Sequence, residues 1–210
     1  MIDLSVVIPV YNTPAYQLLE SVNSMLKQTT KNPFDIVIMN DGSTNEDTIE
    51  AIGILSFYNK GRIKFYDAPV NVGTAANLNQ AHELIKSEYI ALMSSNDVSH
   101  VRRLEIQIAR LEKDKTIDVL GTNLFIFRDI DITRKVVYTT KHKEYPTPEN
   151  TPNNWFTNHG TVIYKNESVK KVGMYKPALR RHQDKDLFER MMAAKMKIVN
   201  LPDVLYGWRR

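Results

Sequence analysis

The chain has 210 residues, 42% of them hydrophobic and 25% charged, which suits one folded domain and excludes a disordered chain. There is no cysteine, so disulfides and thiolate metal sites are excluded, and we expect a cytoplasmic protein because a reducing compartment is favoured. The net charge of +4 permits an anionic ligand, but basic residues are dispersed and nucleic-acid-binding motifs are absent, so we expect no nucleic-acid partner.

The amino-terminal segment predicts a buried strand. Residues 4–10, LSVVIPV, are apolar throughout, as is typical of a strand covered on both faces. This run is too short for a signal-peptide core or a membrane helix, so we expect no membrane span in the chain. Thr13 and Pro14 suit the N-cap and the first helical position, and a helix is therefore predicted from here to about Gln28.

Three more strand and helix pairs follow. The strands are predicted at 34–40, 62–67 and 88–93. A helical pattern follows each strand: one with Ile49, Ile52 and Leu55 inward, one over 74–87 capped by Thr74, and one over 100–114 with Leu104, Ile108 and Leu111 inward. Strand and helix thus alternate four times, which predicts an α/β fold with a parallel, doubly wound sheet and right-handed crossovers.

The second half of the chain changes character. Strand patterns at 118–127 and 135–140 have no full helix between them, which indicates mixed or antiparallel pairing added to the parallel core. Beyond them, the pattern predicts a short strand at 160–165, a helix at 184–195 and an extended segment at 198–208. This part is expected to close one side of a cleft.

Polar residues follow all four strands of the predicted parallel sheet. They are Tyr11-Asn12, then residues 40–43, then 71–77, and finally 94–97. Each cluster alone is explained by a turn, because Asn, Asp and Ser favour turns. In an open α/β sheet, however, ligands bind beyond the carboxyl ends of the strands, and all four clusters lie at that rim. Together they predict a ligand cleft.

Several familiar nucleotide and hydrolase motifs are absent from the sequence. There is no G-x-G-x-x-G after the first strand, no P-loop, no H-E-x-x-H and no G-x-S-x-G. The loop after the first strand, PVYNTP, contains no glycine, unlike the glycine-rich loop of sugar nucleotidyltransferases. These observations exclude dinucleotide, P-loop, zinc-protease and serine-hydrolase sites of the usual kinds.

Six sequence blocks together resemble a known family. SVVIPVYN, NDGSTNEDT, NVGTAANLNQA, SEYIALMSSNDVS, RRHQDKDLFERM and YGWRR occur in this order between Ser5 and Arg210. They resemble the family 2 glycosyltransferases of the GT-A fold, which implies a Rossmann-like, mostly parallel sheet flanked by helices. The chain is also similar to the N-terminal transferase domain of a multi-domain chlorovirus protein, and the family usually continues past this length, so we expect further domains C-terminal to Arg210.

The resemblance implies inverting transfer of a sugar from a nucleotide-diphosphate donor, expected to be a UDP-sugar, to a hydroxyl of a glycan or glycoconjugate acceptor. A non-catalytic domain that only binds nucleotide sugars is the alternative. Because the proline-containing stretch 141–154 looks like a long connection, we expect a single domain over 1–210. Residues 1–115 are then the nucleotide-binding half, and 116–210 the acceptor and catalytic half.

The same resemblance implies the nucleotide contacts. The matching residues are Pro9, Tyr11 and Asn12 in the first loop, Asp41 at the base, Asn71 and Gly73 beside the nucleotide, and Arg209 with Trp208 near the diphosphate. A carboxylate at Asp41 suits a uracil imide N–H, because it can only accept a hydrogen bond. Glycine at 73 suits a place where backbone approaches a ligand closely.

The block HQDKDLFER matches the family's second acidic motif, usually Glu-Asp-x-Asp. The match implies that Asp184 is the catalytic base, with Gln183 in place of the glutamate and Asp186 in a structural role. The start of an amphipathic helix also explains both aspartates, since Asp is common in first turns. His159 and His182 are candidates to face the cleft, although a lone histidine is more often structural.

The segment ALMSSNDVS matches the place where the family carries an Asp-x-Asp motif. Ser94 and Asn96 occupy the two acidic positions, and Asp97 matches an additional aspartate. We expect Ser94 and Asn96 to contact the nucleotide, and Asp97 to be the main protein ligand of Mn²⁺ or Mg²⁺. Such a site would be weak and would fill only with nucleotide bound; a plain turn is the alternative.

Overall fold

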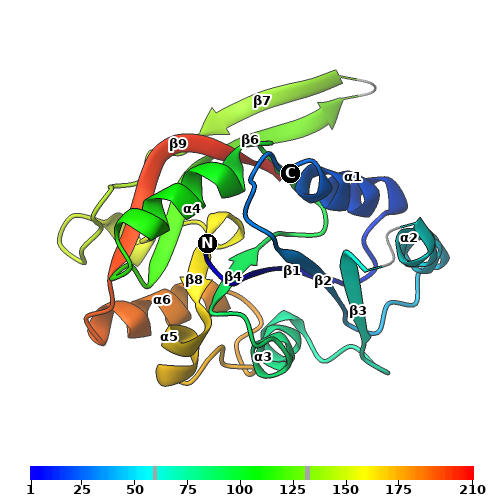
Figure 1. Ribbon diagram of the computed structural model, residues 1–210, viewed down its shortest axis with the longest axis horizontal. Coiled ribbons are helices and arrows are strands. Elements are labelled where there is room, and N and C mark those ends of the chain that lie inside the picture. Colours follow the sequence, from blue (N-terminus) through cyan, green and yellow to red (C-terminus); the bar gives the residue numbers. More distant parts are fainter. Residues whose placement is uncertain (59–60, 131–132) are drawn as a thin grey trace.

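The computed structural model describes residues 1–58, 61–130 and 133–210 (Figure 1). In the first half its elements are β1 (Leu4–Val10), α1 (Ala15–Leu26), β2 (Asp35–Asn40), α2 (Glu46–Tyr58), β3 (Ile63–Asp67), α3 (Thr74–Leu84), β4 (Tyr89–Leu92), β5 (Val98–Ser99) and α4 (Arg103–Lys113). In the second half they are β6 (Val119–Ile130), β7 (Thr133–Thr139), η1 (Pro152–Asn154), η2 (His159–Thr161), β8 (Ile163–Lys165), α5 (Asn166–Lys171), α6 (Gln183–Ala193) and β9 (Ile198–Arg209). The strands form one sheet, in the order β3-β2-β1-β4-β8-β6-β9-β5, and β7 pairs with β6 outside this path.

The parallel half of the sheet is built on β1, which is covered on both faces. β1 pairs in parallel with β2 and β4, and β2 pairs in parallel with β3. Because successive side chains point to opposite faces, Val6 and Ile8 join a core with α1, α2 and α4, while Val7 joins one with α3, α5 and α6. Figure 1 shows α3, α5 and α6 along the lower side, with α1 and α4 above them. This burial explains the unbroken apolar run of β1.

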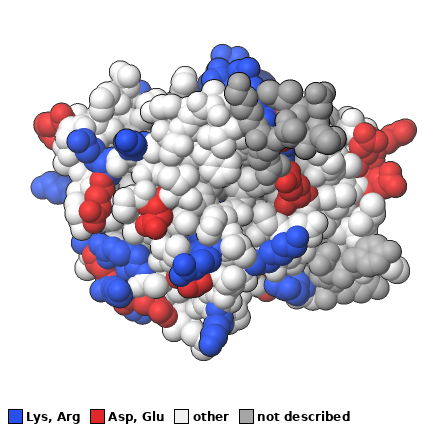
Figure 2. All heavy atoms as spheres, turned by 90° about the horizontal axis from the view of Figure 1, so that it is seen from above, with Lys and Arg blue, Asp and Glu red and all other residues white. Residues whose placement is uncertain are grey.

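The second half adds strands of mixed direction. β8 is antiparallel to β4 and β6, β6 is parallel to β9, and β5 and β7 run antiparallel to β9 and β6 respectively. The predicted fold class is therefore confirmed, with a mostly parallel core, helices on both faces and a mixed C-terminal part. Within the described chain, no helix has the length and apolar character needed to cross a membrane. Basic and acidic side chains are interspersed on the face shown in Figure 2.

Two buried side chains of α4 join the two halves of the sheet. Arg103 donates from Nη2 to the carbonyl oxygens of Leu92 (2.9 Å) and Val162 (3.3 Å), and from Nε to Gln107 (3.0 Å). Gln107 in turn donates from Nε2 to the carbonyl of Leu120 (2.8 Å). Burial lowers the pKa of Arg103 to about 10, so it stays charged at pH 7. In the described part of the chain no carboxylate pairs with it; its oxygen acceptors are the Gln107 amide oxygen and the two backbone carbonyls. We call Arg103 and Gln107 together the α4 clamp.

Two helices begin differently from the prediction. Pro14, not Thr13, is the N-cap of α1, because the Thr13 hydroxyl is bonded to Ser95 Oγ at 2.7 Å instead. Gly73, not Thr74, is the N-cap of α3. Gly73 has φ 89°, a left-handed conformation that glycine adopts without steric cost. In both cases a contact or backbone requirement outside the helix determines where it begins.

The inward face of α2 also differs from the prediction. Leu55 is buried and Ile52 partly buried, as expected, but Ile49 is 51% exposed. Thr48 is buried in its place, and its hydroxyl donates to the carbonyl oxygen of Thr13 at 2.8 Å. A hydrogen bond to the loop after β1 thus rotates the helix away from the orientation that hydrophobicity alone suggests. The short elements β5 and α5 were not predicted.

Candidate active site

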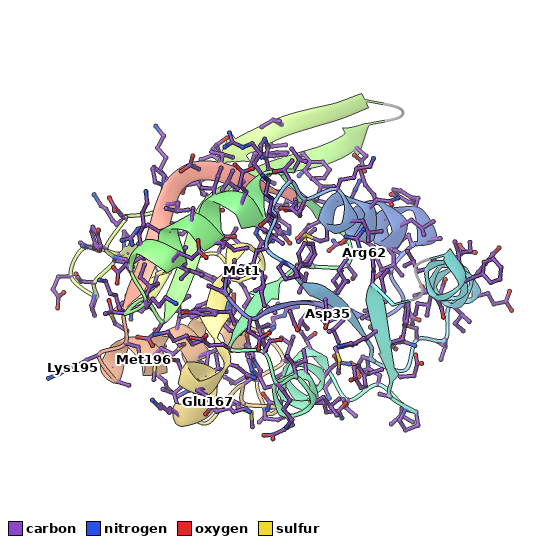
Figure 3. The ribbon with its side chains drawn as sticks, viewed as in Figure 1. Met1, Asp35, Arg62, Glu167, Lys195 and Met196 are labelled. Atoms are coloured by element: carbon purple, nitrogen blue, oxygen red, sulfur yellow. The ribbon has the colours of Figure 1, made fainter. Side chains whose placement is uncertain are left out.

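Three adjoining cavities open where β1, β2 and β4 end. The central cavity, of about 410 Å³, is lined by strand-end residues that include Pro9, Tyr11, Asp41 and Ser94. The outer cavity, of about 360 Å³, shares Tyr11 and Asp41 with it and adds Asn71 and Gly73. The distal cavity, of about 540 Å³, shares Ser94 with the central one and adds Asp97 and Asp184. The opposite rim of the sheet is marked in Figure 3 by Asp35, which begins β2, and Arg62, which precedes β3.

Eight of the eleven predicted site residues therefore line these cavities. Asn12, Asn96 and Arg209 are not among the lining residues, and each instead bonds to the chain itself. Asn12 has φ 48°, and its amide oxygen accepts from the backbone N–H groups of Thr44 (2.8 Å) and Asn45 (2.9 Å) just before α2. Asn12 thus shapes the loop on which its neighbour Tyr11 stands half exposed.

The Asp41 carboxylate is fixed by the loop that precedes α3. Its Oδ1 accepts from the backbone N–H of Val72 (2.8 Å), and its Oδ2 accepts from Gly73 N–H (2.9 Å) and Asn71 Nδ2 (2.9 Å). Gly42 beside it is at φ 64°, and a Cβ there would lie 2.5 Å from the Val70 carbonyl carbon. A carboxylate has about four acceptor positions, so one remains at Asp41 for a donor in the cavity.

Residues 94–97 are tied to β9 in a similar way. Asp97 is 3% exposed; its Oδ1 accepts from Arg209 N–H (2.8 Å) and its Oδ2 from the Tyr206 hydroxyl (2.7 Å). Burial raises the pKa of Asp97, and these hydrogen bonds partly offset that rise. The Asn96 carbonyl accepts from Arg209 Nε at 2.7 Å. Ser94 remains at the surface of the central and distal cavities.

Arg209 lies on the opposite side of β9 from Trp208. Trp208 lines the distal cavity, whereas the 7% exposed Arg209 forms ion pairs with Glu20 and Asp129 and lies over the Phe127 ring at 4.9 Å. This alternation is what a strand imposes on consecutive residues. The guanidinium is therefore not among the groups that line the three cavities, and its place near the diphosphate stays a prediction.

Helix α6 carries two aspartates with different surroundings. Asp186 pairs with Lys176 (2.6 Å) and Arg190 (2.7 Å), and these partners outweigh burial and lower its pKa. Asp184, half buried and facing the distal cavity, has no hydrogen-bond or ion-pair partner within the described ranges. His182, whose φ is 58°, is the exposed N-cap of α6. Of the two aspartates, only Asp184 is left with both oxygens for a ligand.

A comparison with protein families identifies the family of the chain. The Glycosyl transferase family 2 profile matches residues 5–173, which is most of the chain. The chain belongs to glycosyl transferase family 2. The match includes the strand-end loops that line the central and outer cavities, and it ends before α6.

Curated relatives extend along almost the whole chain. The putative glycosyltransferase EpsE of Bacillus subtilis (strain 168) is 29% identical over 208 residues, covering 98% of this chain and 72% of the relative. An uncharacterized glycosyltransferase of Methanocaldococcus jannaschii is 29% identical over 206 residues, covering 98% of this chain and 70% of the relative. The similarity to these relatives thus extends beyond residue 173, where the family profile ends.

Solved structures of S. aureus TarS share the fold. TarS superimposes with a TM-score of 0.80 at 22% identity, covering all of this chain and 37% of TarS. The complex of TarS 1–349 with UDP-GlcNAc gives a TM-score of 0.80 at 21% identity and covers 59% of that chain. This family 2 chain thus corresponds to one part of a longer protein in the solved structures.

For a divalent cation, the distal cavity presents two carboxylates, Asp97 and Asp184. Among the described residues, no group of three or more acidic or histidine side chains lies close enough to hold a metal. Asp97 accepts one hydrogen bond from β9 on each oxygen, and the Ser94 side chain also stabilises its carboxylate, so only part of its acceptor capacity remains. This arrangement fits only a site that diphosphate oxygens and waters complete.

Not every cavity residue was predicted from the sequence, and Asn77 is one that was missed. Asn77, on α3, is 1% exposed and lines the central cavity. Neither its amide nitrogen nor its amide oxygen has a hydrogen-bond partner among the residues described. A buried amide without partners costs about 1–3 kcal/mol, so a bound ligand that satisfies it gains affinity. In sequence, an asparagine inside a helical pattern gives no such signal.

Proposed function

We propose that this family 2 transferase moves a sugar from a UDP-sugar to an acceptor hydroxyl with inversion at the anomeric carbon. The observation that carries the proposal is the Asp184 carboxylate, unpaired in the described chain, which lines a cavity adjoining the one that contains Tyr11 and Asp41. The structurally similar TarS has been solved with UDP and with UDP-GlcNAc, which supports a uridine diphosphate donor here.

In this proposal the nucleotide lies along the outer and central cavities. The remaining acceptor position of Asp41 takes the imide N–H of uracil, and the half-exposed Tyr11 ring lies beside the base. Pro9, Asn71, Gly73 and Ser94 supply the surrounding wall. Residues 1–115 supply most of this wall and act as the nucleotide-binding half, while 116–210, the acceptor and catalytic half, completes it with residues such as Gln183.

The chemical step is a single displacement. Asp184 accepts the proton of the acceptor hydroxyl as its oxygen forms a bond to the anomeric carbon, and the bond from that carbon to the diphosphate breaks on the opposite face. The electron pair leaves with the diphosphate, so UDP is released and the configuration inverts. A glycan or glycoconjugate acceptor enters through the distal cavity, where Trp208 offers an apolar surface for a sugar ring.

We also propose that Mn²⁺ or Mg²⁺ takes part, held weakly and only with nucleotide bound. Asp97 would hold it, together with diphosphate oxygens and waters. The ion supplies positive charge that offsets the charge growing on the leaving diphosphate. Arg209 would act through Asp97, because its backbone N–H and its guanidinium fix the 94–97 turn.

A donor-turnover experiment tests the proposal. The chain is incubated with UDP-glucose, UDP-galactose and UDP-GlcNAc in Mn²⁺, with and without saccharide acceptors, and UDP release is measured. We expect slow hydrolysis of one donor, and faster release when an acceptor fits. Tight UDP binding without turnover on any donor would favour the non-catalytic alternative. Salt-steep binding to DNA or RNA would contradict both.

The whole protein's activity, acceptor and partners are part of this proposal, because the chain spans only 37% to 61% of the TarS chains. A cytoplasmic location, the absence of a nucleic-acid partner, further domains after Arg210 and a chlorovirus origin all stay predictions.

A further inference from the structure

A chain of five hydrogen bonds, four of them buried and the last part-buried, runs from the end of α3 to the central cavity; we call it the relay. It begins at the Ile85 carbonyl, which can only accept, so Asn166 must present its Nδ2 to that oxygen (3.0 Å). The amide oxygen of Asn166 then faces His82 Nδ1 at 2.8 Å. Because an amide oxygen only accepts, His82 carries its proton on Nδ1.

The next two bonds have a fixed direction as well. Burial lowers the pKa of His82 to about 4, so at pH 7 its Nε2 is bare and accepts from the Tyr164 hydroxyl at 3.2 Å. A phenol has only one proton, so Tyr164 must accept from the Tyr175 hydroxyl, also at 3.2 Å. Burial raises the pKa of both tyrosines, which keeps both hydroxyls protonated.

The relay ends at His159. The Tyr175 proton is already used, so its oxygen accepts from His159 Nε2 at 2.7 Å, and that nitrogen carries the proton. Burial lowers the pKa of His159, so the ring is neutral and its Nδ1 is unprotonated. No described residue donates to this nitrogen. The ring is held edge-on to Tyr175 (5.5 Å) and Phe188 (6.1 Å).

His159 stands between the two cavities that the transferred sugar must connect. It lines the central cavity with Tyr11 and Asp41, and the distal cavity with Asp184. A bare ring nitrogen accepts a hydrogen bond from a hydroxyl but repels a phosphate oxygen, which also only accepts. The relay therefore presents a group that distinguishes sugar from diphosphate at this junction.

We propose that His159 Nδ1 accepts a hydrogen bond from a hydroxyl of the sugar being transferred. This inference rests on the proposed function and adds a sugar-specific contact to it. Tyr175, Tyr164, His82 and Asn166 act as positioning residues, since they determine which ring nitrogen of His159 is bare.

Calorimetry with two ligands tests the inference. UDP and each of UDP-glucose, UDP-galactose and UDP-GlcNAc are titrated into wild type, His159→Ala and the control His182→Ala, whose exposed histidine lies outside the three cavities. We expect His159→Ala to weaken binding of the preferred UDP-sugar by about 3- to 10-fold, the effect of one neutral hydrogen bond, and to leave UDP unchanged. His182→Ala should match wild type for both ligands.

Two further measurements sharpen the test. One monodeoxy analogue of the preferred UDP-sugar lacks the hydroxyl that bonds His159, so it should bind wild type more weakly than the parent by the same factor. His159→Ala should bind this analogue and the parent UDP-sugar equally well. In wild type, nitrogen-15 NMR of the histidine rings at pH 7 should show His159 protonated on Nε2, a readout that needs no variant. Tyr175→Phe should return the ring to a mixture of its two neutral forms.

The outcomes separate the two levels of proposal. Wild type that binds no UDP-sugar would overturn the proposed function and this inference with it. Wild-type binding of a UDP-sugar that persists unchanged in His159→Ala, or a His159 protonated on Nδ1, would overturn the inference alone. Equal weakening of UDP and UDP-sugar would do the same, because it would assign His159 to the nucleotide or to the fold.

Discussion

The strand-end rim and helix α6 hold their carboxylates in contrasting ways. At the rim, Asp41 and Asp97 have both oxygens hydrogen-bonded by the chain itself, and so fix the loops around them. On α6, Asp184 faces the distal cavity and, in the described chain, has no such bond. The same contrast separates Asn77, without partners in the described part, from the bonded residues around it. Asp41 and Asp97 thus build the groove and keep only part of their acceptor capacity for a ligand, whereas Asp184 and Asn77 keep all of theirs.

Replacing the unpaired carboxylate should have the largest effect. Asp184→Asn should keep UDP affinity but lower the transfer rate by about 10²–10⁴-fold, because an amide cannot take the acceptor's proton. Rates of UDP release and UDP titrations measure the two quantities separately. Asp186→Asn is the matched control: it removes a carboxylate paired with Lys176 and Arg190, so it should cost stability and keep transfer. Transfer by Asp184→Asn at the wild-type rate would remove the base assignment.

A second change separates the scaffolding role of Asp97 from metal binding. In wild type, Mn²⁺ should tighten UDP binding by about 5- to 150-fold, and Asp97→Ala should abolish that coupling. Tyr206→Phe is the control, since it removes one hydrogen bond to Asp97 and keeps the carboxylate. Calorimetry of UDP with and without Mn²⁺ measures both. Coupling that survives in Asp97→Ala would return residues 94–97 to a purely structural turn.

A third change removes hydrogen bonds at Asp41, at the other end of the strand-end rim. Asp41→Asn places an NH₂ group against the backbone N–H groups of Val72 or Gly73, which leaves a buried donor without an acceptor. We expect the free energy of unfolding to fall by about 1–3 kcal/mol, measured in urea, and UDP affinity to fall with it. The exposed Asp3→Asn should change stability by no more than about 0.5 kcal/mol. Wild-type stability in Asp41→Asn would contradict the proposed scaffolding role.

The smallest expected effect compares two asparagines on α3. Asn77→Leu removes an amide that lacks partners in the described chain, so it should raise the free energy of unfolding by up to about 1 kcal/mol while weakening UDP-sugar binding about 3- to 10-fold. Asn79 bonds both the N–H and the carbonyl of Tyr175, so Asn79→Leu should lower stability. Urea denaturation and UDP-sugar titration give the four values. A loss of stability in Asn77→Leu would mean that its amide has a partner in the unliganded protein.

The spacing of hydrophobic residues was enough to predict the main strands and helices. The apolar run at 4–10 forms β1 as expected, and Leu104, Ile108 and Leu111 are all buried on α4. These features depend on local spacing against a core, which a sequence displays directly. The placement of Asp41 and Ser94 around one groove followed from the rule that strand ends share a rim, whereas Asp184, on α6, was predicted from the family resemblance.

Side-chain direction and long-range pairing were beyond the sequence. A motif match locates Arg209 in the chain, but the alternation of β9 turns it away from Trp208 and toward Glu20 and Asp129. Asn77 is unremarkable in sequence because its lack of partners exists only in three dimensions. The state of His159 depends on residues as far away as His82, which no local pattern connects to it.

The α4 clamp has a consequence for how such transferases diversify. Arg103 and Gln107 reach across to the second half through backbone carbonyls, at Val162 and Leu120, and not through side chains. A backbone carbonyl is the same whatever the side chain, so side chains at these positions of the second half can change without removing the acceptors of the clamp. A chimera that grafts a relative's 116–210 onto this 1–115 should therefore fold when strand positions match, whereas residues 1–115 alone would lose the Val162 and Leu120 acceptors of the clamp.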